Sequence, residues 1–335
     1  MLQVKKRQMD FDIFRGVGII LMIMGHIGFT EIFDHFIHAF HMPMFFFISG
    51  FFFKSNIESK CSIKFYMIKK IKTLLIPYAV FAIFHSVIWI IMGNGFRELL
   101  NFLWINSDDL PIAGALWFLT ALFFTDLFYF LIDRYIYKEF WKHCIVILLC
   151  AFGNFYNLFL PITLPFSLGA ALVGLGLFHI GKCAKKYCDS KVIDRSFKLQ
   201  IPLLILLTIA TVVLIFVNGY INMRSETYAM IPLFWINALL AIVLGINYSK
   251  RFDAALNDNN ILKKWIADIG KNSIVYVCLN QVVVMGTKWI VNSVIPSEVY
   301  WLVRASIVFV ITFGVLFILT LVLTKTKLKI LLGRF

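Results

Sequence analysis

The residues best suited to chemistry in this chain lie in its first hydrophobic segment, which runs from Phe11 to about Phe29. This segment carries Asp12 and Arg15 near its start and His26 near its far end. An ionisable side chain inside a membrane span costs at least ~2.5 kcal/mol on insertion scales, so such groups usually face a protein interior or a wet cavity. Three of them on one span predict a functional site rather than a plain anchor.

A second group of polar residues follows where the chain turns back toward the next hydrophobic segment. It consists of carboxylates and histidines, namely Glu31, Asp34, His35, His38 and His41. Neutral imidazole is a common transition-metal ligand, so the His38-x-x-His41 spacing permits a metal site. That spacing alone is a weak signal, and we favour a relay of protons at a hydroxyl group. We expect no metal and no bound cofactor.

The spacing of Arg15 and His26 predicts that they act on one face of a helix. Eleven residues correspond to about 16 Å of helical rise and to close to three turns. A histidine that titrates near neutrality suits general-base chemistry on a hydroxyl group. Each residue taken alone has a structural alternative. Arg15 and Asp12 at i, i+3 form a pair that neutralises a helix end, and His26 is then a satisfied buried histidine.

The composition indicates that membrane-spanning helices position these residues. Of 335 residues, 61% are hydrophobic and 15% are charged, against about 25% charged residues in an ordinary soluble domain. We expect an all-α integral membrane protein with a single domain over residues 1–335, no fused soluble domain, and an N-terminal segment retained as the first span. Apolar windows long enough to cross ~30 Å of hydrocarbon predict ten spans, at about 11–30, 36–53, 72–92, 112–132, 141–159, 162–181, 199–218, 228–247, 272–294 and 299–323.

The net charge of +14 is explained by topology and does not require a nucleic-acid partner. Most basic residues precede the first span or follow spans two, four, six, eight and ten, whereas the alternate loops hold only Arg97 and Arg224. The positive-inside rule therefore predicts that both termini are cytosolic. Anionic lipids attract such basic loops. Lys288 and Arg304, near the outer ends of the last two spans, either snorkel outward or contact an acidic glycan.

The remaining motifs carry little chemistry. The six cysteines fall in predicted spans or cytosolic loops, and Cys183-x4-Cys188 matches no standard zinc or redox motif, so we treat them as reduced and structural. The small residues between 169 and 181, together with Ser49 and Gly50, indicate close helix packing. No Gly-rich phosphate loop, strand alternation or repeat of fixed period occurs in the sequence.

The order of the polar residues resembles the acyltransferase-3 family of multi-span membrane acyltransferases. The matches are DIFRG at residues 12–16 followed by His26, which gives the family's Arg-x10-His pattern, and FHMPMFFFISGF at residues 40–51. Segments 74–78, 116–119 and 273–276 support the resemblance, which covers essentially the whole chain. One departure is Asn280, because members often carry histidine four residues after the late tyrosine, here Tyr276.

The resemblance implies an O-acyltransferase that moves acetyl, or another short acyl group, from cytosolic acyl-CoA to a cell-surface or lipid-linked glycan. The candidate catalytic residues are His26, Arg15 and Asp12. We expect Arg15 also to bind the acyl-CoA, and His26 to be the general base or to carry the acyl group covalently. The resemblance also implies a bacterial inner membrane. Further candidates for catalytic support or the acceptor site are Glu31, Asp34, His38, His41, Trp117, Tyr276 and Asn280; Trp117 equally fits an interfacial belt.

Two other classes of function compete with the enzyme. A transporter or flippase of a lipid-linked sugar or small anion would use the same arginine and histidine as a translocation or proton path. It predicts inverted repeats, yet the second half of the sequence holds no counterpart of Asp12, Arg15 and His26. A purely structural membrane partner leaves the polar first span unexplained.

Overall fold

The computed structural model describes residues 8–54, 62–93, 95, 114–160, 162–190, 198–296 and 298–334. These residues are almost entirely helical, with one short antiparallel hairpin in which Ile221 pairs with Tyr228. The hairpin was not predicted. In chain order the elements are α1 (Met9–Ile27), α2 (Glu31–His38), α3 (His41–Phe51), α5 (Ile63–Lys70), η1 (Ile71–Leu75), α6 (Ile76–Ile91), α8 (Trp117–Tyr135), α9 (Glu139–Phe159), η2 (Pro165–Ser167), α10 (Leu168–Asp189), α11 (Ile201–Asn218), β1 (Ile221–Asn222), β2 (Thr227–Tyr228), α12 (Ile231–Ala255), α13 (Ile261–Lys271), α14 (Ser273–Val294), α15 (Trp301–Lys325) and η3 (Lys327–Leu332).

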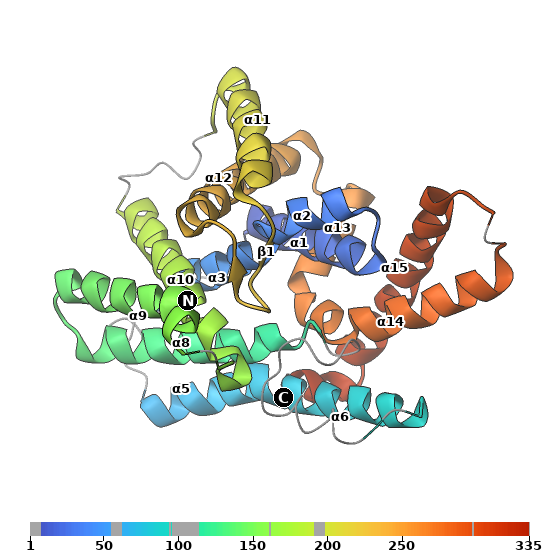
Figure 1. Ribbon diagram of the computed structural model, residues 1–335, viewed down its shortest axis with the longest axis horizontal. Helices are drawn as coiled ribbons and strands as arrows, with labels where there is room; N and C mark the ends of the chain where they lie inside the picture. The colour runs from blue at the N-terminus through green and yellow to red at the C-terminus, as the bar shows by residue number, and fades with distance from the viewer. Residues whose placement is uncertain are drawn as a thin grey trace.

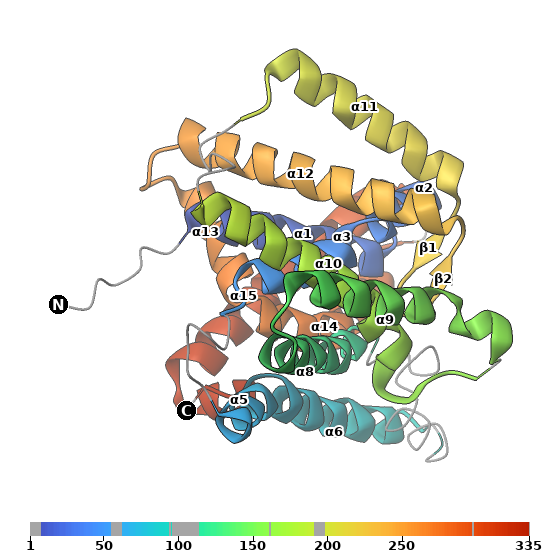
Figure 2. The same cartoon turned by 90° about the vertical axis from the view of Figure 1, so that its left-hand side faces the viewer.

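The helices surround α1 and α3. Figure 1 shows these two in the middle of the molecule, with α11 and α12 on one side, α8 to α10 on a second and α14 and α15 on a third. Figure 2 shows most helices running in about the same direction, with α5 and α13 at one end and α2, β1 and β2 at the other. We call these the α13 end and the hairpin end.

Seven helices of the described part are long and apolar enough to cross a membrane, at residues 63–91, 139–159, 165–189, 201–218, 231–255, 273–294 and 301–325. They agree with seven of the ten predicted spans. The other three differ for physical reasons. α1 and α8 each carry three charged residues, and the predicted span 36–53 is interrupted at residues 39–40, between α2 and α3. Arg97 lies outside the described residues.

α3 packs against α10 through a close backbone approach. A Cβ atom on Gly50 would lie 1.8 Å from the carbonyl oxygen of Phe178, and one on Gly181 would lie 2.1 Å from that of Phe47. Helices approach this closely only where glycine replaces larger side chains. The prediction of close packing by small residues is therefore confirmed at this interface.

The burial of α1 explains how it tolerates charge. The helix contacts α3, α12, α13, α14 and α15, and Val17 is its one exposed residue. Asp12 is 4% exposed, and the side chain of Arg15 is 26% exposed. The polar residues of this helix therefore face protein more than lipid, as the cost of an ionisable group in hydrocarbon demands.

Candidate active site

Two helix caps fix the position of His26. The residue lies in the last turn of α1, which ends at Gly28 with a left-handed φ of 75° and an N–H donated to the Met24 carbonyl at 3.1 Å. Glycine adopts this conformation at little cost. The Thr30 hydroxyl then accepts a hydrogen bond from the Phe33 N–H at 3.0 Å and begins α2. The chain therefore reverses immediately after His26.

His26 lines a cavity of about 260 Å³ at the hairpin end. Five predicted site residues meet here although they come from four different helices: His26, Asp34, His38, His41 and Trp117. The remaining lining residues come from the same helices, the β hairpin, α14 and the segment before α8: Met22, Met42, Phe45, Gly114, Ala115, Phe118, Tyr220, Asn222, Met223, Arg224, Val277 and Gln281.

Asp34 orients the ring of His38. The Nδ1 atom of His38 lies 3.2 Å from Asp34 Oδ1 and 2.9 Å from the Asp34 carbonyl oxygen. Both oxygens accept, so Nδ1 carries the proton and Nε2 is the basic nitrogen of the neutral ring. Tyr220 donates to Asp34 Oδ2 at 3.0 Å. Burial raises the pKa of Asp34, but the hydrogen bonds from His38 and Tyr220 outweigh it, and the net pKa is lowered.

His41 is oriented in the same way by the end of α2. The ring is 5% exposed, and its Nδ1 donates to the Ile37 carbonyl at 2.7 Å. The Nε2 atom of neutral His41 is therefore also a proton acceptor. The His38 and His41 rings meet edge to face, with centroids 5.0 Å apart. Two adjacent imidazoles that both keep Nε2 basic suit the predicted proton relay.

The His26 ring has no hydrogen-bond partner within the part of the chain that the structure describes. Neither ring nitrogen is sealed from the cavity. The ring lies in the electrostatic field of His38, Arg224 and Asp34. An imidazole with accessible nitrogens in a polar cavity can accept the proton of an incoming hydroxyl group.

Sequence reasoning missed the far wall of this cavity, which the hairpin and α14 supply. The backbone N–H of Arg224 donates to Asn222 Oδ1 at 3.0 Å, and the Gly114 N–H donates to Gln281 Oε1. A Cβ atom on Gly114 would lie 2.7 Å from an Arg224 guanidinium nitrogen, so this charge sits directly against the Gly114 backbone. The sequence feature that could have pointed to this wall is Arg224 itself, a rare cation in a sparsely charged loop.

Three predicted residues lie beside the cavity rather than in its wall. Glu31 is exposed in an adjoining hollow, which it shares with Asp34. Tyr276 and Asn280 are fully buried on α14, where Asn280 Nδ2 donates to the Tyr276 carbonyl at 2.8 Å. The residues next to them, Val277 and Gln281, face the cavity instead.

Arg15 and Asp12 lie toward the α13 end. Their side chains approach to 3.5 Å, and the guanidinium lies 5.0 Å from the centroid of the Phe52 ring. Lys182 and Lys185 contact the rings of the residues on either side of Phe52. The end of α3 is thus surrounded by three cations, Arg15, Lys182 and Lys185, which we call the cationic cluster.

A packed layer lies between the cationic cluster and the cavity. Ile19 and Met22 project from α1 between Arg15 and His26, and they are 0% and 5% exposed. Met22 also forms part of the cavity lining. The cavity and the cationic cluster are therefore separated by buried side chains of the helix that carries both Arg15 and His26.

These features define a multi-pass helical membrane protein with a histidine-lined polar cavity at one end of its central helix. A family model described as an acyltransferase domain, Acyl_transf_3, matches residues 10–324, and the chain belongs to this acyltransferase-3 family. The match includes α1, the cavity and the cationic cluster, and it confirms the resemblance seen in the motifs. Comparisons with curated proteins and with solved structures give no significant match.

Proposed function

We propose that this protein transfers an acetyl group from acetyl-CoA to a hydroxyl group of a cell-surface or lipid-linked glycan. One observation carries the proposal. His26 presents accessible ring nitrogens to a polar cavity, at the family's spacing from Arg15 on the same central helix. The donor and the acceptor are chosen for their chemistry, since a hydroxyl acceptor needs a base and an acyl-CoA needs a cationic site.

In this proposal the α13 end faces the cytosol of a bacterial inner membrane, and the cationic cluster binds the phosphates of acetyl-CoA. Basic residues concentrate in cytosolic loops. A guanidinium can grip phosphate with paired hydrogen bonds, and lysines add point charges. Asp12 lies 3.5 Å from Arg15 and is suited to hold the guanidinium in place.

The chemistry at the cavity follows from the orientation of the histidines. His26 accepts the proton of the acceptor hydroxyl as its oxygen attacks the thioester carbonyl carbon. The new C–O bond forms, the C–S bond of the tetrahedral intermediate breaks, and the thiolate leaves as free CoA with the proton that His26 accepted. His38 and His41, each with a basic Nε2, can pass the proton onward, and the Arg224 charge favours the anionic intermediate.

The thioester must reach His26 past the layer of Ile19 and Met22. A pantetheine arm is long and thin enough for the ~16 Å between the turns of Arg15 and His26. Met22 has an unbranched, flexible side chain, so a rotamer change there opens the floor of the cavity with little rearrangement of the backbone. A transporter or flippase, the competing proposal, is not favoured by the family match.

The proposal is tested by acetyl transfer from radiolabelled acetyl-CoA in the purified, detergent-solubilised chain. His26→Gln is expected to lower transfer about 10²- to 10⁴-fold, the usual contribution of a general base. Arg15→Ala is expected to raise the KM for acetyl-CoA. His85→Gln is the matched control, because His85 is a histidine of a predicted span that is buried on α6, outside the cavity.

The enzyme and its donor are established if label appears on an added glycan or as released acetate, disappears in His26→Gln and persists in His85→Gln. If wild-type protein uses another acyl-CoA but not acetyl-CoA, the proposed donor changes and the proposed mechanism stands. Failure with a panel of acyl-CoAs, together with movement of a lipid-linked sugar across vesicles, would refute the proposal.

A further inference from the structure

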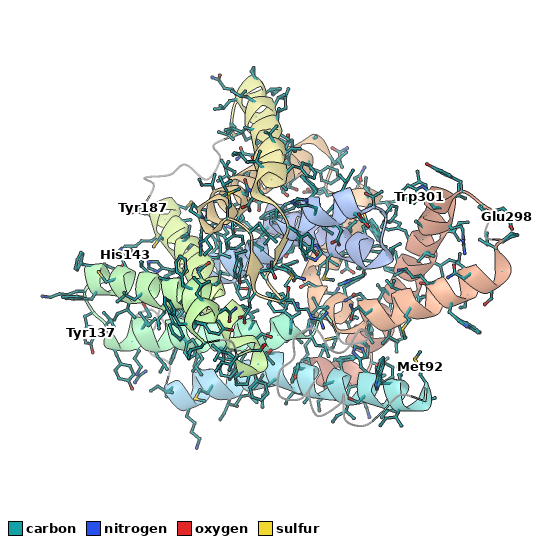
Figure 3. The ribbon with its side chains drawn as sticks, viewed as in Figure 1. Met92, Tyr137, His143, Tyr187, Glu298 and Trp301 are labelled. Atoms are coloured by element: carbon teal, nitrogen blue, oxygen red, sulfur yellow. The ribbon has the colours of Figure 1, made fainter. Side chains whose placement is uncertain are left out.

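A separate cluster of metal-ligating side chains lies at the α13 end. His143 comes from the first turns of α9, and His179 and Cys183 come from α10. His143 Nδ1 lies 2.6 Å from His179 Nε2, and Cys183 Sγ lies 3.7 Å from the same nitrogen. All three potential ligand atoms are within 4.8 Å of one another. Figure 3 shows His143 at the margin of the molecule, beside the end of α10 that carries Tyr187.

The two helices hold these groups together by ordinary packing. His179 and Cys183 are four residues apart and therefore share one face of α10. α9 packs along α10 and brings His143 to that face. His143 is distant in sequence from the other two residues, and the spacing of His179 and Cys183 matches no standard metal motif. No sequence pattern therefore reveals the cluster.

Tyr129 fixes the orientation of the central histidine. Its hydroxyl oxygen lies 3.0 Å from His179 Nδ1, and both residues are buried. When Nδ1–H donates to this oxygen, Nε2 has its lone pair directed at His143 and Cys183. Metal-bound histidines characteristically donate their second ring N–H to such an outer partner. One proton between the two ring nitrogens accounts for their 2.6 Å contact, and a metal cation would take its place.

We propose that His143, His179 and Cys183 bind one transition-metal ion of the zinc class. Imidazole and thiolate ligands together select Zn²⁺ over hard cations such as Mg²⁺ or Ca²⁺. Tetrahedral zinc, with bonds of roughly 2.0 to 2.3 Å, places two imidazole nitrogens about 3.3 Å apart and a nitrogen and a sulfur about 3.6 Å apart. The sulfur already lies at about this separation from His179 Nε2, at 3.7 Å, and the two rings need to part by less than ~1 Å. All three atoms are within 4.8 Å of one another, so any approach of the sulfur to His143 is a shift of about the same size.

The charges around the cluster permit a cation. Lys142 is adjacent to His143, but its ammonium group is bound by Asp133 at 2.9 Å and by Glu139 at 3.3 Å. Lys186, near Cys183 on α10, is paired with the same Glu139 at 3.3 Å. A metal at this place would cross-link α9 to α10, the helix on which α3 packs. The inference is independent of the proposed acyl transfer.

The test uses the full chain without a histidine tag, purified in detergent and stripped of metal with a chelator. Co²⁺ is added as the probe, because cobalt bound by a thiolate gives a charge-transfer band in the near ultraviolet. We expect one Co²⁺ per chain, displaced by Zn²⁺. Cys183→Ser is expected to abolish the band, and His143→Gln to weaken binding at least tenfold. Tyr129→Phe should weaken it by 10- to 100-fold, the usual effect of an outer partner.

Cys188→Ser is the matched control, because Cys188 lies on the same helix outside the cluster and should leave the band unchanged. A measurement on unaltered protein guards against misfolded variants: Zn²⁺ should protect Cys183, but not Cys188, from alkylation detected by mass spectrometry. The proposal is overturned if wild-type protein binds no cobalt, if the band survives in Cys183→Ser, or if Zn²⁺ protects both thiols equally.

Discussion

Lys288 and His26 are joined through the backbone, since the Lys288 ammonium group donates to the His26 carbonyl oxygen at 3.2 Å. The last carbonyls of a helix have no partner within the helix, so this bond completes the end of α1 and ties α14 to it. It also brings a positive charge near the His26 ring. The sequence suggested snorkelling or glycan contact for Lys288, and the structure shows this different contact.

The Lys288 contact predicts a positioning role. Lys288→Met is expected to lower kcat about tenfold, because a charge-assisted hydrogen bond contributes roughly 1.5–3 kcal/mol, part of which holds the His26 turn in place. Lys288→Arg keeps a donor and a charge and should restore most of the rate. Steady-state acetyl transfer measures both variants. Equal rates for Lys288→Met and wild type would show that Lys288 does not position His26.

Arg224 is expected to act on the reaction in the cavity rather than on donor binding. Its guanidinium lines the cavity far from the cationic cluster and favours the anionic intermediate there, so Arg224→Ala should lower kcat about 10²- to 10³-fold and leave the acetyl-CoA KM unchanged. Arg304→Ala is the matched control. Arg304 donates to Asn292 Oδ1 at 2.6 Å outside the cavity. A comparable change in both variants would show that the charge of the hairpin end, and not Arg224 itself, matters.

The contact between Gly50 and Phe178 predicts a strong effect on stability. Gly50→Ala places a methyl group 1.8 Å from a backbone oxygen, so α3 and α10 must separate, and the melting temperature should fall sharply. Gly314→Ala meets no atom within 4 Å and should be neutral or stabilising by up to about 1 kcal/mol, the helix propensity gained. Thermal unfolding monitored by tryptophan fluorescence compares the two. Similar melting temperatures would contradict the close approach.

Glu226 predicts a pH dependence of stability. It lies in the turn between β1 and β2, where it accepts hydrogen bonds from the Ala170 N–H at 3.2 Å and from Asn157 at 3.3 Å. Burial raises the pKa of Glu226, and the hydrogen bonds from Tyr156, Asn157 and Ala170 only partly offset it. The folded state therefore holds this proton more tightly than the unfolded state, whose carboxyl has a pKa near 4.5.

The tighter binding of the Glu226 proton stabilises the folded state. This stabilisation is present at pH values below the unfolded-state pKa and is lost as the pH rises through the folded-state pKa. Glu226→Gln removes this titration while keeping an oxygen for the Ala170 N–H. As the pH falls from 7 toward 4.5, the melting temperature of wild type should therefore rise relative to that of Glu226→Gln. A constant difference over this range would contradict the raised pKa.

Much of the site was predictable because its residues are close in sequence. His26, Asp34 and His41 lie within sixteen residues on a chain that turns back on itself, and the structure brings them to one cavity. Arg224, from the hairpin, and Gln281, from α14, reach the same cavity although they lie nearly two hundred residues or more further along the chain. Their place depends on how distant helices pack, which periodicity and spacing do not encode.

The fold was predictable where apolar length alone decides it. The predicted spans at 141–159 and 272–294 agree with α9 and α14 within about two residues at each end. The break between α2 and α3 was not predicted, because hydrophobic residues continue through Ala39 and Phe40. Pro43, in the first turn of α3, is the residue that marks it as a kink or a helix start. The hairpin was missed since each strand has only two residues, too few for an alternating pattern.

The shortness of α3 has a consequence for how the two substrates would meet. Eleven residues rise about 16 Å, roughly half of a ~30 Å hydrocarbon layer. His41 begins this helix, and the cavity lies against it. In the proposed orientation, water and the proposed glycan would enter the outer half of the bilayer through the cavity. Only the remaining inner half would then separate the acceptor from the donor, and neither substrate would have to cross the whole membrane.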